Sequence, residues 1–555
     1  MTNSTMTVMV SIIRFLTNSS TKHSDSRARY KAQQLKQSTA IFLDATIRST
    51  NIQRRQSLKI LRHIIKHTER EILQYIPEKQ MILECSLVLV QAYVAHLKLG
   101  RGFFDRFRKQ PFVSAKKCFQ SLIYLLIPER QDMVIDTILN FLQRENLWKV
   151  EFICDEILTM VLECKSPASL LLYKIVNYVE SLLAKNDVPQ ARHTMTVLQN
   201  IIQPQYWDEI QHSDISKLLR FYHSSAVLGE SKNQIYELRR GFEICLRNLI
   251  RVIKPEQLIK LLITMLPLTF DTTLSDETML EFGTTVEFAA STLTLSEIPS
   301  QEEMFVQEYL LSHIRSETAS KSILASRIYA KMLDRGRNFL EFNTPKVFHE
   351  GTYYDIDINQ YNPAQRHTFE DHRREFTESL TIAIEYHSQR RTNLEVFYNV
   401  ICMVLVEIPC GYTACAVVCL LLGIQRRLLE SSTRYTPQQT NRIHATFISI
   451  MTLINWIHRG SSLTSYVNTV LNRRFDNAPH LNPPLKEIYE YAQHHVTWNN
   501  ETLFFDALEM RYGLWKCFRI NEPKSPAPQK IYSRLGGGRK GKARRQSTGY
   551  YKIGL

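Results

Sequence analysis

Hydrophobic residues recur with the period of an amphipathic helix through most of this chain. In 170–184, six leucine, isoleucine and valine residues follow i, i+3, i+4, i+7 spacing, and polar residues take the opposite face. The stretch 81–97 is apolar almost all round, which is typical of a helix buried between neighbours. No segment shows sustained strict alternation, so we expect no β-sheet.

Signals for helix starts and stops arrive at short intervals along the chain. Ser166-Pro167, Thr436-Pro437 and Asn482-Pro483 place proline where a first helical turn tolerates it. Ser300 and Glu303 have the spacing of a capping box. The pattern predicts about twenty antiparallel helices with short loops, as in stacked helical pairs. The expected fold is therefore all-α, a degenerate armadillo/HEAT-like helical-repeat rod (α-solenoid) with flexible basic termini.

The helical pattern lapses once in the interior, where prolines and a glycine interrupt a stretch without helical period. We interpret that stretch as a connection between two halves of the rod. The chain then divides into a basic and flexible N-terminal segment, an N-terminal helical-repeat region, the irregular connection, a C-terminal helical-repeat region and a basic flexible tail: 1–29, 30–336, 337–366, 367–518 and 519–555.

Charge is distributed unevenly along the 555 residues. Apolar residues make up 44% and charged residues 22%, which excludes wholesale disorder. Residues 1–70 hold 13 Lys/Arg and 3 Asp/Glu, and residues 523–555 hold 9 Lys/Arg and no acid, whereas the body between them is slightly acidic. Two basic ends suit contact with an anionic surface, such as the inner leaflet of a membrane. The alternative is that both ends are only solvated tails.

The acidic body disfavours nucleic acid as a partner, because a nucleic-acid-binding solenoid carries positive charge along its groove. Among the basic residues, Arg54, Arg62 and Lys66 recur at spacings that could share one helix face. The candidates for contact with anionic lipids are Arg14, Lys22, Arg27, Arg29, Lys31, Arg54, Arg55, Lys59 and Arg62.

Ser547 follows two arginines and a glutamine, as in the site of a basophilic kinase. Its phosphorylation would cancel up to about two positive charges in the C-terminal tail. The alternative is a tail that is never modified.

The sequence offers no pattern for catalysis or metal binding. The GxSxG motif of lipases and esterases is missing, and this counts against a lipid hydrolase, the enzymatic alternative. The ten cysteines lie within helical patterns without zinc-site spacing, so we expect them to be reduced, buried and inert. The glycine-rich string 536–542 lacks the Ser/Thr and the preceding strand of a P-loop. We expect no enzyme activity, no cofactor and no metal.

One stretch, 396–424, is apolar and long enough to span a membrane. Glu407 and a Pro409-Cys410-Gly411 break divide it. We therefore predict two short helices folded back on each other and buried in the solenoid.

Two blocks of the sequence resemble the rolling blackout (eighty-five-requiring) family. In the first, 392–425, the match runs through Asn393, Glu395, Tyr398, Glu407, Leu420 and Gln425. It is preceded by the run Asp371-His372-Arg373-Arg374-Glu375-Phe376 and followed by Ala478-Pro479-His480-Leu481 with Pro483 and Pro484. The second block, 115–205, is similar in Cys118-Phe119-Gln120-Ser121-Leu122 and then Leu147-Trp148.

The resemblance implies a non-catalytic helical rod at the cytosolic face of the plasma membrane. Proteins of this family anchor the type III phosphatidylinositol 4-kinase alpha complex, together with its tetratricopeptide-repeat adaptor and hyccin. Their N-terminus holds the membrane through palmitoylated cysteines and a basic lipid-binding patch, and their C-terminal region contacts the adaptor. A generic HEAT/armadillo adaptor that binds protein or RNA in the cytosol or nucleus is the alternative.

This sequence departs from the family at its N-terminus. The first cysteine is Cys85, so the N-terminal cysteine cluster is not present in it. The run Arg27-Ala28-Arg29-Tyr30-Lys31 is similar to the basic segment that follows those cysteines in the family. Two alternatives stay open: the family's N-terminus is missing from this sequence, or the protein is a divergent member. In both cases constitutive acyl anchoring is in question, and the basic residues provide an electrostatic attachment.

Overall fold

A computed structural model describes most of the chain as helix. The described residues are 26–39, 47–68, 73, 76–99, 105–127, 130–227, 234–293, 295, 300–430, 435–489 and 500–518, and they include no strand. The chain forms two compact units, Met1–Gln257 and Leu258–Leu555. The arginine and lysine candidates at 14 and 22, and Ser547, lie outside the described residues.

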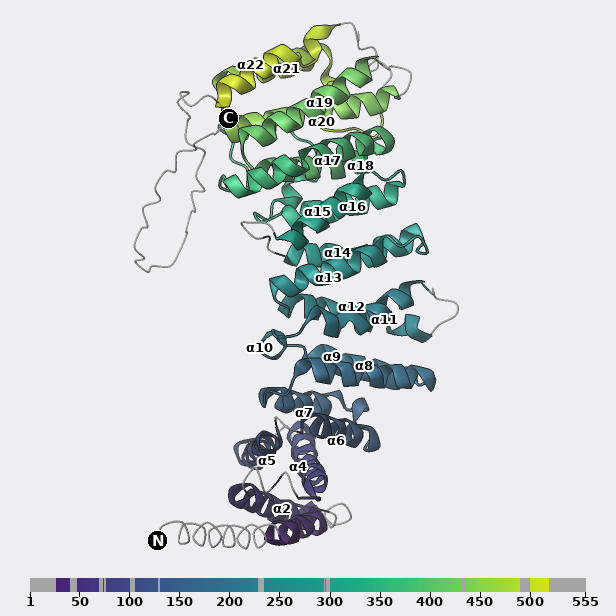
Figure 1. Ribbon diagram of the computed structural model, residues 1–555, viewed down its shortest axis with the longest axis vertical. Coiled ribbons are helices and arrows are strands. Elements are labelled where there is room, and N and C mark those ends of the chain that lie inside the picture. The colour runs from purple at the N-terminus through teal and green to yellow at the C-terminus, as the bar shows by residue number, and fades with distance from the viewer. Residues whose placement is uncertain are drawn as a thin grey trace, which may run out of the picture. The chain divides into compact units, whose positions relative to one another are not determined.

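The first unit is a stack of helices that pack in the order of the chain (Figure 1). Its most extensively packed pairs are α4 with α5, α11 with α12, and α9 with α12. After a helix over 26–39 come α2 (Ile47–His67), α4 (Lys79–Leu99), α5 (Asp105–Leu126), α6 (Gln131–Arg144), η1 (Leu147–Lys149), α7 (Glu151–Glu163), α8 (Ala168–Ala184), α9 (Val188–Ile201), α10 (Pro204–Trp207), α11 (His212–Val227) and α12 (Gln234–Val252).

The second unit repeats this architecture, with neighbouring pairs such as α15 with α16 and α21 with α22 (Figure 1). The boundary between the units falls in the first turn of α13 (Pro255–Thr269), which belongs to the second unit from residue 258 on. The other elements of this unit are α14 (Asp276–Thr292), α15 (Gln301–Ile314), α16 (Ala319–Leu333), η2 (Phe339–Phe342), α17 (Pro363–His387), α18 (Arg391–Glu407), α19 (Gly411–Glu430), α20 (Pro437–His458), α21 (Ser461–Asn477), η3 (Pro479–Leu481), η5 (Glu501–Leu503) and α22 (Ala507–Phe518).

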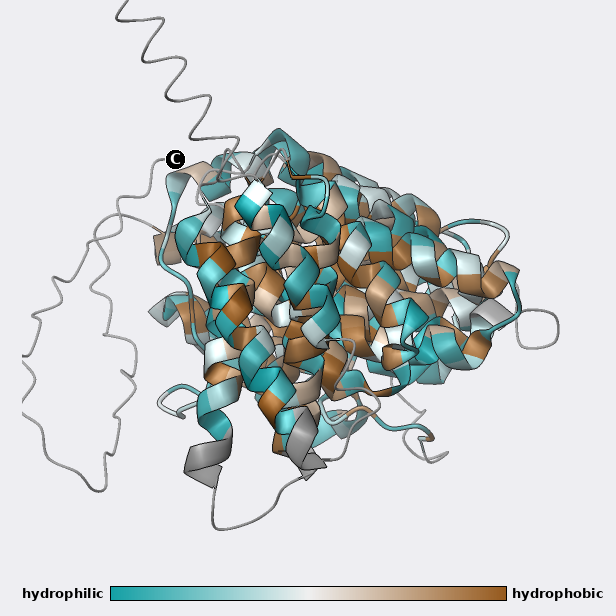
Figure 2. Ribbon diagram, turned by 90° about the horizontal axis from the view of Figure 1, so that it is seen from below, coloured by the Kyte–Doolittle hydropathy of each residue, from teal (hydrophilic) through white to brown (hydrophobic). Residues whose placement is uncertain are grey.

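Hydrophobic positions recur along the helices (Figure 2), and many of these side chains are buried. The stretch 170–184 lies in α8, which buries Leu172, Ile175 and Val179 as its periodicity predicts. The stretch 81–97 lies in α4, whose core residues are buried on several sides. The predicted all-α solenoid is therefore confirmed.

The predicted helix starts differ in outcome. Ser300 and Glu303 form the complete capping box of α15, and Thr436 caps α20 ahead of a proline in its first turn. Pro167 has extended backbone and stands one residue before α8, at the N-cap. The prediction of a helix start at Pro483 is wrong, because residues 482–489 contain no helix. A second proline follows directly and disfavours helical backbone at the residue before it.

The stretch 337–366 holds only the short turn η2 before α17 begins. Its extended backbone is held by hydroxyl groups of α20. Ser449 Oγ accepts from the amide of Lys346 at 3.1 Å, and Thr452 Oγ1 accepts from the amide of Phe348 at 3.1 Å. These bonds satisfy backbone groups that a helix would otherwise pair internally.

Two of the described helices are long and apolar enough to cross a membrane, Lys79–Leu97 within α4 and Gly411–Glu430, which is α19. About half of each is buried inside the protein, 50% and 56% respectively. Length and composition alone do not separate a membrane span from a core helix. The apolar stretch 396–424 is divided between α18 and α19 by a break at 408–410, so the prediction of two helices is confirmed.

Candidate functional site: a basic surface on the first helices

The first two described helices form an acid-free basic surface. Residues 26–39 and α2 together carry ten Lys/Arg and no Asp or Glu. The pair is held by buried hydroxyl groups, since Ser38 Oγ and Ser57 Oγ lie 2.6 Å apart. Thr39 Oγ1 also donates to the thiol of Cys85 on α4, at 3.5 Å. These contacts fix which faces of the two helices point to solvent.

The orientation of α2 is set by its buried residues Leu58, Leu61 and Ile64. Spacings of four, three and four residues place a set of basic side chains on one helix face away from this core. We call this set the α2 stripe, and all of its members are exposed: Arg55, Lys59, Arg62 and Lys66.

The predicted face composed of positions 54, 62 and 66 needs a correction. Arg54 is half-buried and lies nearer the core side of α2, whereas Arg55 and Lys59 complete the exposed face. Position 54 is one residue, or about 100° of helix rotation, from position 55. Lys66 was not among the lipid-binding candidates, and its i+4 spacing from Arg62 was the signal that could have added it.

The basic residues of the two helices influence each other electrostatically. Partial burial and the nearby positive groups of His67, Lys31, Arg27 and Lys66 lower the pKa of His63. Two of these groups belong to the helix 26–39 and two to α2. The positive surface therefore continues from one helix to the other.

The remaining candidates on the helix 26–39 have different environments. Arg27 and Arg29 are exposed, and Lys31 is half-buried with its Nζ 3.2 Å from Gln34 Oε1. Arg29 Nε lies 3.9 Å from a carboxylate oxygen of Glu78, a weak and exposed ion pair. Lys36, which sequence reasoning left out, is exposed on the same helix.

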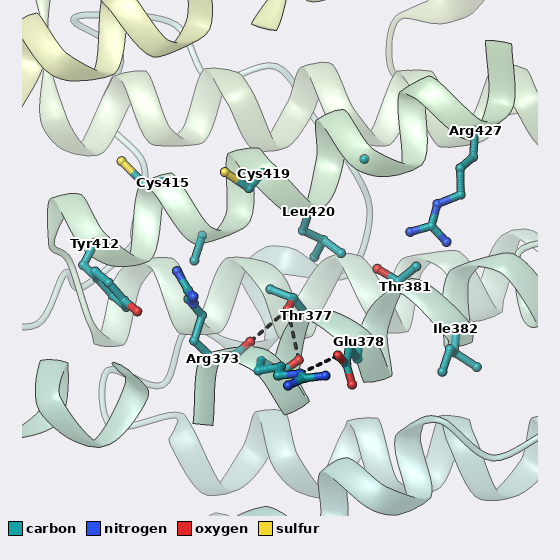
Figure 3. Close-up of a pocket in the computed structure, with 13 residues that line it drawn as sticks. Arg373, Thr377, Glu378, Thr381, Ile382, Tyr412, Cys415, Cys419, Leu420 and Arg427 are labelled. Carbon is teal, nitrogen blue, oxygen red and sulfur yellow. Dashed lines mark hydrogen bonds and ion pairs between the residues drawn. The ribbon is translucent and has the colours of Figure 1, made fainter. Parts of the chain in front are cut away.

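The second unit has an open groove of about 660 Å³ between α17 and α19 (Figure 3). Arg373, Thr381 and Ile382 of α17 face it, and Tyr412 and Arg427 mark its two ends on α19 (Figure 3). The groove thus combines an apolar floor with arginines at its edge.

The arginines of the groove already have partners. Arg374 pairs with Glu378 at 2.8 Å, and Arg427 pairs with Glu385 at 2.5 Å. The guanidinium of Arg373 lies over the ring of Tyr412, 5.5 Å from its centroid. The lining residues include neither histidine nor serine, whereas Cys415 and Cys419 are both among them.

Cysteine placement corrects one expectation. Eight of the ten thiols are buried, but Cys415 is only partly buried and Cys419 is exposed at the groove. Their helix turns its apolar side to the core, and position 419 falls on the opposite side. Burial raises the pKa of the Cys415 thiol to about 11, so it is a weak nucleophile at neutral pH. Among the described residues, no group of three or more His, Cys, Asp and Glu could hold a metal ion.

Stacked helical pairs in both units define the chain as a helical-repeat protein of scaffold type. The family model described as "EFR3, armadillo repeat" matches residues 96–512. The chain therefore belongs to the EFR3 family, the rolling blackout family that its sequence resembles. The matched region begins after α2, so the basic surface lies outside it.

The other comparisons add little. No curated protein matches the chain. A solved structure titled "Circular tandem repeat protein with novel repeat topology and enhanced subunit contact surfaces" is 12% identical, covers 89% of this chain and 98% of its own, and has a TM-score of 0.19. That similarity is too low to inform the fold or the function.

Proposed function

We propose that this chain is a non-enzymatic, membrane-associated scaffold at the cytosolic face of the plasma membrane. It anchors a phosphatidylinositol 4-kinase complex there and supports synthesis of phosphatidylinositol 4-phosphate. The observation that carries the membrane part is the α2 stripe, four exposed cations on a helix that has no acidic residue.

The energy of such a contact is adequate for reversible attachment. Each Lys or Arg near an anionic leaflet contributes about 1 kcal/mol, so the four stripe residues with Arg27 supply about 5 kcal/mol. That corresponds to a dissociation constant of about 0.2 mM. Binding of this strength is weak for one anchor, but a complex that holds two or more anchors gains avidity.

Family membership supports the partners that we propose. They are the type III phosphatidylinositol 4-kinase alpha, its tetratricopeptide-repeat adaptor and hyccin, together with anionic membrane lipids. A stack of helices offers long side surfaces for such proteins without any catalytic residue. No nucleic acid is expected, although a cationic stripe could attract one, and this makes RNA a useful competitor in the test.

The test is recruitment of the purified kinase complex to vesicles that contain phosphatidylserine. We expect the full chain to carry the complex onto the vesicles and to raise phosphatidylinositol 4-phosphate formation there. The charge-removed variant R55Q/K59Q/R62Q/K66Q should bind the complex in solution and fail to bring it to the vesicles. A chain that binds vesicles without recruiting the complex would contradict the partner assignment, and displacement from vesicles by low concentrations of RNA would favour the adaptor alternative.

A further inference from the structure

The last helix of the described residues, α22, is apolar on two opposite faces. One face is packed: Met510, Gly513, Leu514 and Cys517 are buried against neighbouring helices. The other face exposes Leu508 by 74%, Tyr512 by 50% and Trp515 by 50%. Spacings of four and three residues place these three side chains in one stripe, which we call the α22 stripe.

The packed face holds α22 in a fixed position beside α21 (Figure 1). Tyr466 Oη accepts from the amide of Asp506 at 2.7 Å, and Asp506 Oδ1 caps the first turn by accepting from the amides of Leu508 and Glu509, both at 2.9 Å. At Gly460, the N-cap of α21, a Cβ atom would lie 2.6 Å from Cys517, so the glycine permits close approach of α22. The α22 stripe therefore points outward from a rigid support.

In the part of the chain that the structure describes, α22 is the last helix of the second unit. Terminal repeats of solenoids normally present a polar outer face, because no further repeat covers them. Here the outer face carries a leucine and two aromatic rings, with Tyr512 and Trp515 stacked at 6.3 Å between centroids. Such a patch indicates a contact surface.

Basic and acidic side chains on and beside the stripe are equal in number among the described residues, and the sequence that follows α22 is basic. Lys516 Nζ lies 4.7 Å from the centroid of the Tyr512 ring, and Arg511 is exposed between Leu508 and Tyr512. Asp506 and Glu509 are the exposed acids nearby. Directly after α22, residues 519–555 contribute ten Lys/Arg and one Glu.

We propose that the α22 stripe inserts into the headgroup region of an anionic membrane. Tyrosine and tryptophan favour that region, because their rings are apolar and their polar tips stay hydrated. Leu508 supplies apolar area, and Arg511 and Lys516 remain at the level of the phosphates. This inference rests on the proposed membrane function and adds a second contact whose energy comes from insertion rather than from charge alone.

The direct test uses fluorescence of the full chain on vesicles that contain phosphatidylserine and brominated lipid. Trp148, Trp207 and Trp456 are at most 7% exposed, so bromine should quench chiefly Trp515. We expect vesicles to quench the wild-type emission and the W515F variant to lose that quenching. Trp498 lies outside the described residues, so the difference between the two proteins is the signal.

Binding measurements then separate insertion from other roles. We expect L508S/Y512S/W515S to weaken vesicle binding about tenfold, since the variant loses the three apolar side chains that insert into the headgroup region. The matched control is F475S on α21, which removes another exposed ring (72%) and should change nothing. Because all four substituted side chains are exposed, each variant should keep the circular dichroism of the wild type.

The possible failures are distinguishable. If vesicles bind through the α2 stripe but Trp515 is not quenched and the triple variant binds normally, the inference is wrong and the proposed function stands. If the triple variant binds vesicles normally yet no longer binds a purified protein of the kinase complex, the stripe is a protein contact and the inference is also wrong. If the wild-type chain does not bind vesicles at all, both fail.

Discussion

The carboxylate of Glu407, at the end of α18, accepts a hydrogen bond from the backbone amide of Gly336 at 3.2 Å. The same oxygen, Oε1, accepts from the amide of Arg335 at 3.1 Å, and Oε2 lies 3.4 Å from Asn359 Nδ2. Glu407 is only 2% exposed. One buried acid thus holds both ends of the chain segment that joins α16 to α17.

The first prediction concerns the pH dependence of stability. Burial raises the pKa of Glu407 from 4.5 to about 7, although the amides of Gly336 and Arg335 oppose the shift. The folded protein therefore holds this proton more tightly than the unfolded chain does. The stabilisation is complete below pH 4.5 and is lost as the pH rises through about 7.

The variant E407Q removes that titration. We expect thermal unfolding followed by circular dichroism to give a wild-type melting temperature that falls from pH 5 to pH 8 more steeply than that of E407Q. The free-energy difference between the two proteins should change by a few kcal/mol over this range. Parallel pH profiles would mean that Glu407 titrates normally in the folded state.

The second prediction concerns Gly336. An added Cβ atom would lie 2.9 Å from the carbonyl oxygen of Asp357 and 2.5 Å from Asn338 Nδ2. Those two groups are themselves hydrogen-bonded at 2.8 Å, so neither can move without loss. We expect G336A to lower the free energy of unfolding by about 1–3 kcal/mol, measured by urea denaturation.

The matched control for this change is G423A on α19, where an added Cβ atom meets nothing within 4 Å. Alanine is the better helix former, so this variant should gain up to about 1 kcal/mol. Equal effects of G336A and G423A would show that steric crowding at Gly336 does not decide the outcome.

The third prediction concerns Arg474, whose side chain is fully buried on α21. Nε donates to the carbonyl of Leu503 at 2.7 Å, and Nη1 donates to the carbonyls of His444 and Leu481 at 3.1 and 3.2 Å. The variant R474M leaves three buried carbonyls without this donor. We expect a loss of about 3 kcal/mol or more in urea denaturation.

The neighbouring residue provides the control for that experiment. Arg473 is exposed on the same helix, and R473A should change stability by less than about 0.5 kcal/mol. An unchanged denaturation midpoint for R474M would contradict the role given to the buried guanidinium in joining α21 to η3 and η5.

Some of this architecture follows from sequence because it depends on neighbours in the chain. The buried face of α8 and the capping box of Ser300 are local patterns, and both are confirmed. The partners of Glu407 are not local, since Arg335 lies 72 residues earlier. Sequence alone indicated only that this acid interrupts an apolar stretch.

For the basic surface, too, the sequence pattern predicts the helix but not which of its faces is exposed. Isoleucines at 52, 60 and 65 blur the apolar face of α2, so the rotation of the helix is set by packing on Ser57, Leu58 and Leu61. The sequence pattern therefore predicted one face with Arg54, Arg62 and Lys66, whereas packing places Arg55 and Lys59 on the exposed face in place of Arg54. The α22 stripe could not be predicted from the sequence for a related reason. That helix is apolar on two faces, and only packing determines which face is buried.

The most direct measurement of the central claim is co-sedimentation of the full chain with vesicles that contain phosphatidylserine. The variant R55Q/K59Q/R62Q/K66Q removes the α2 stripe, and K149Q/K185Q/R220Q/K254Q removes the same charge from exposed positions elsewhere in the first unit. We predict salt-sensitive binding that the first variant weakens by about tenfold to a thousandfold and that the second leaves within about twofold of the wild type. Equal binding of the two variants would contradict the account, because attachment would then depend on total charge and not on this surface.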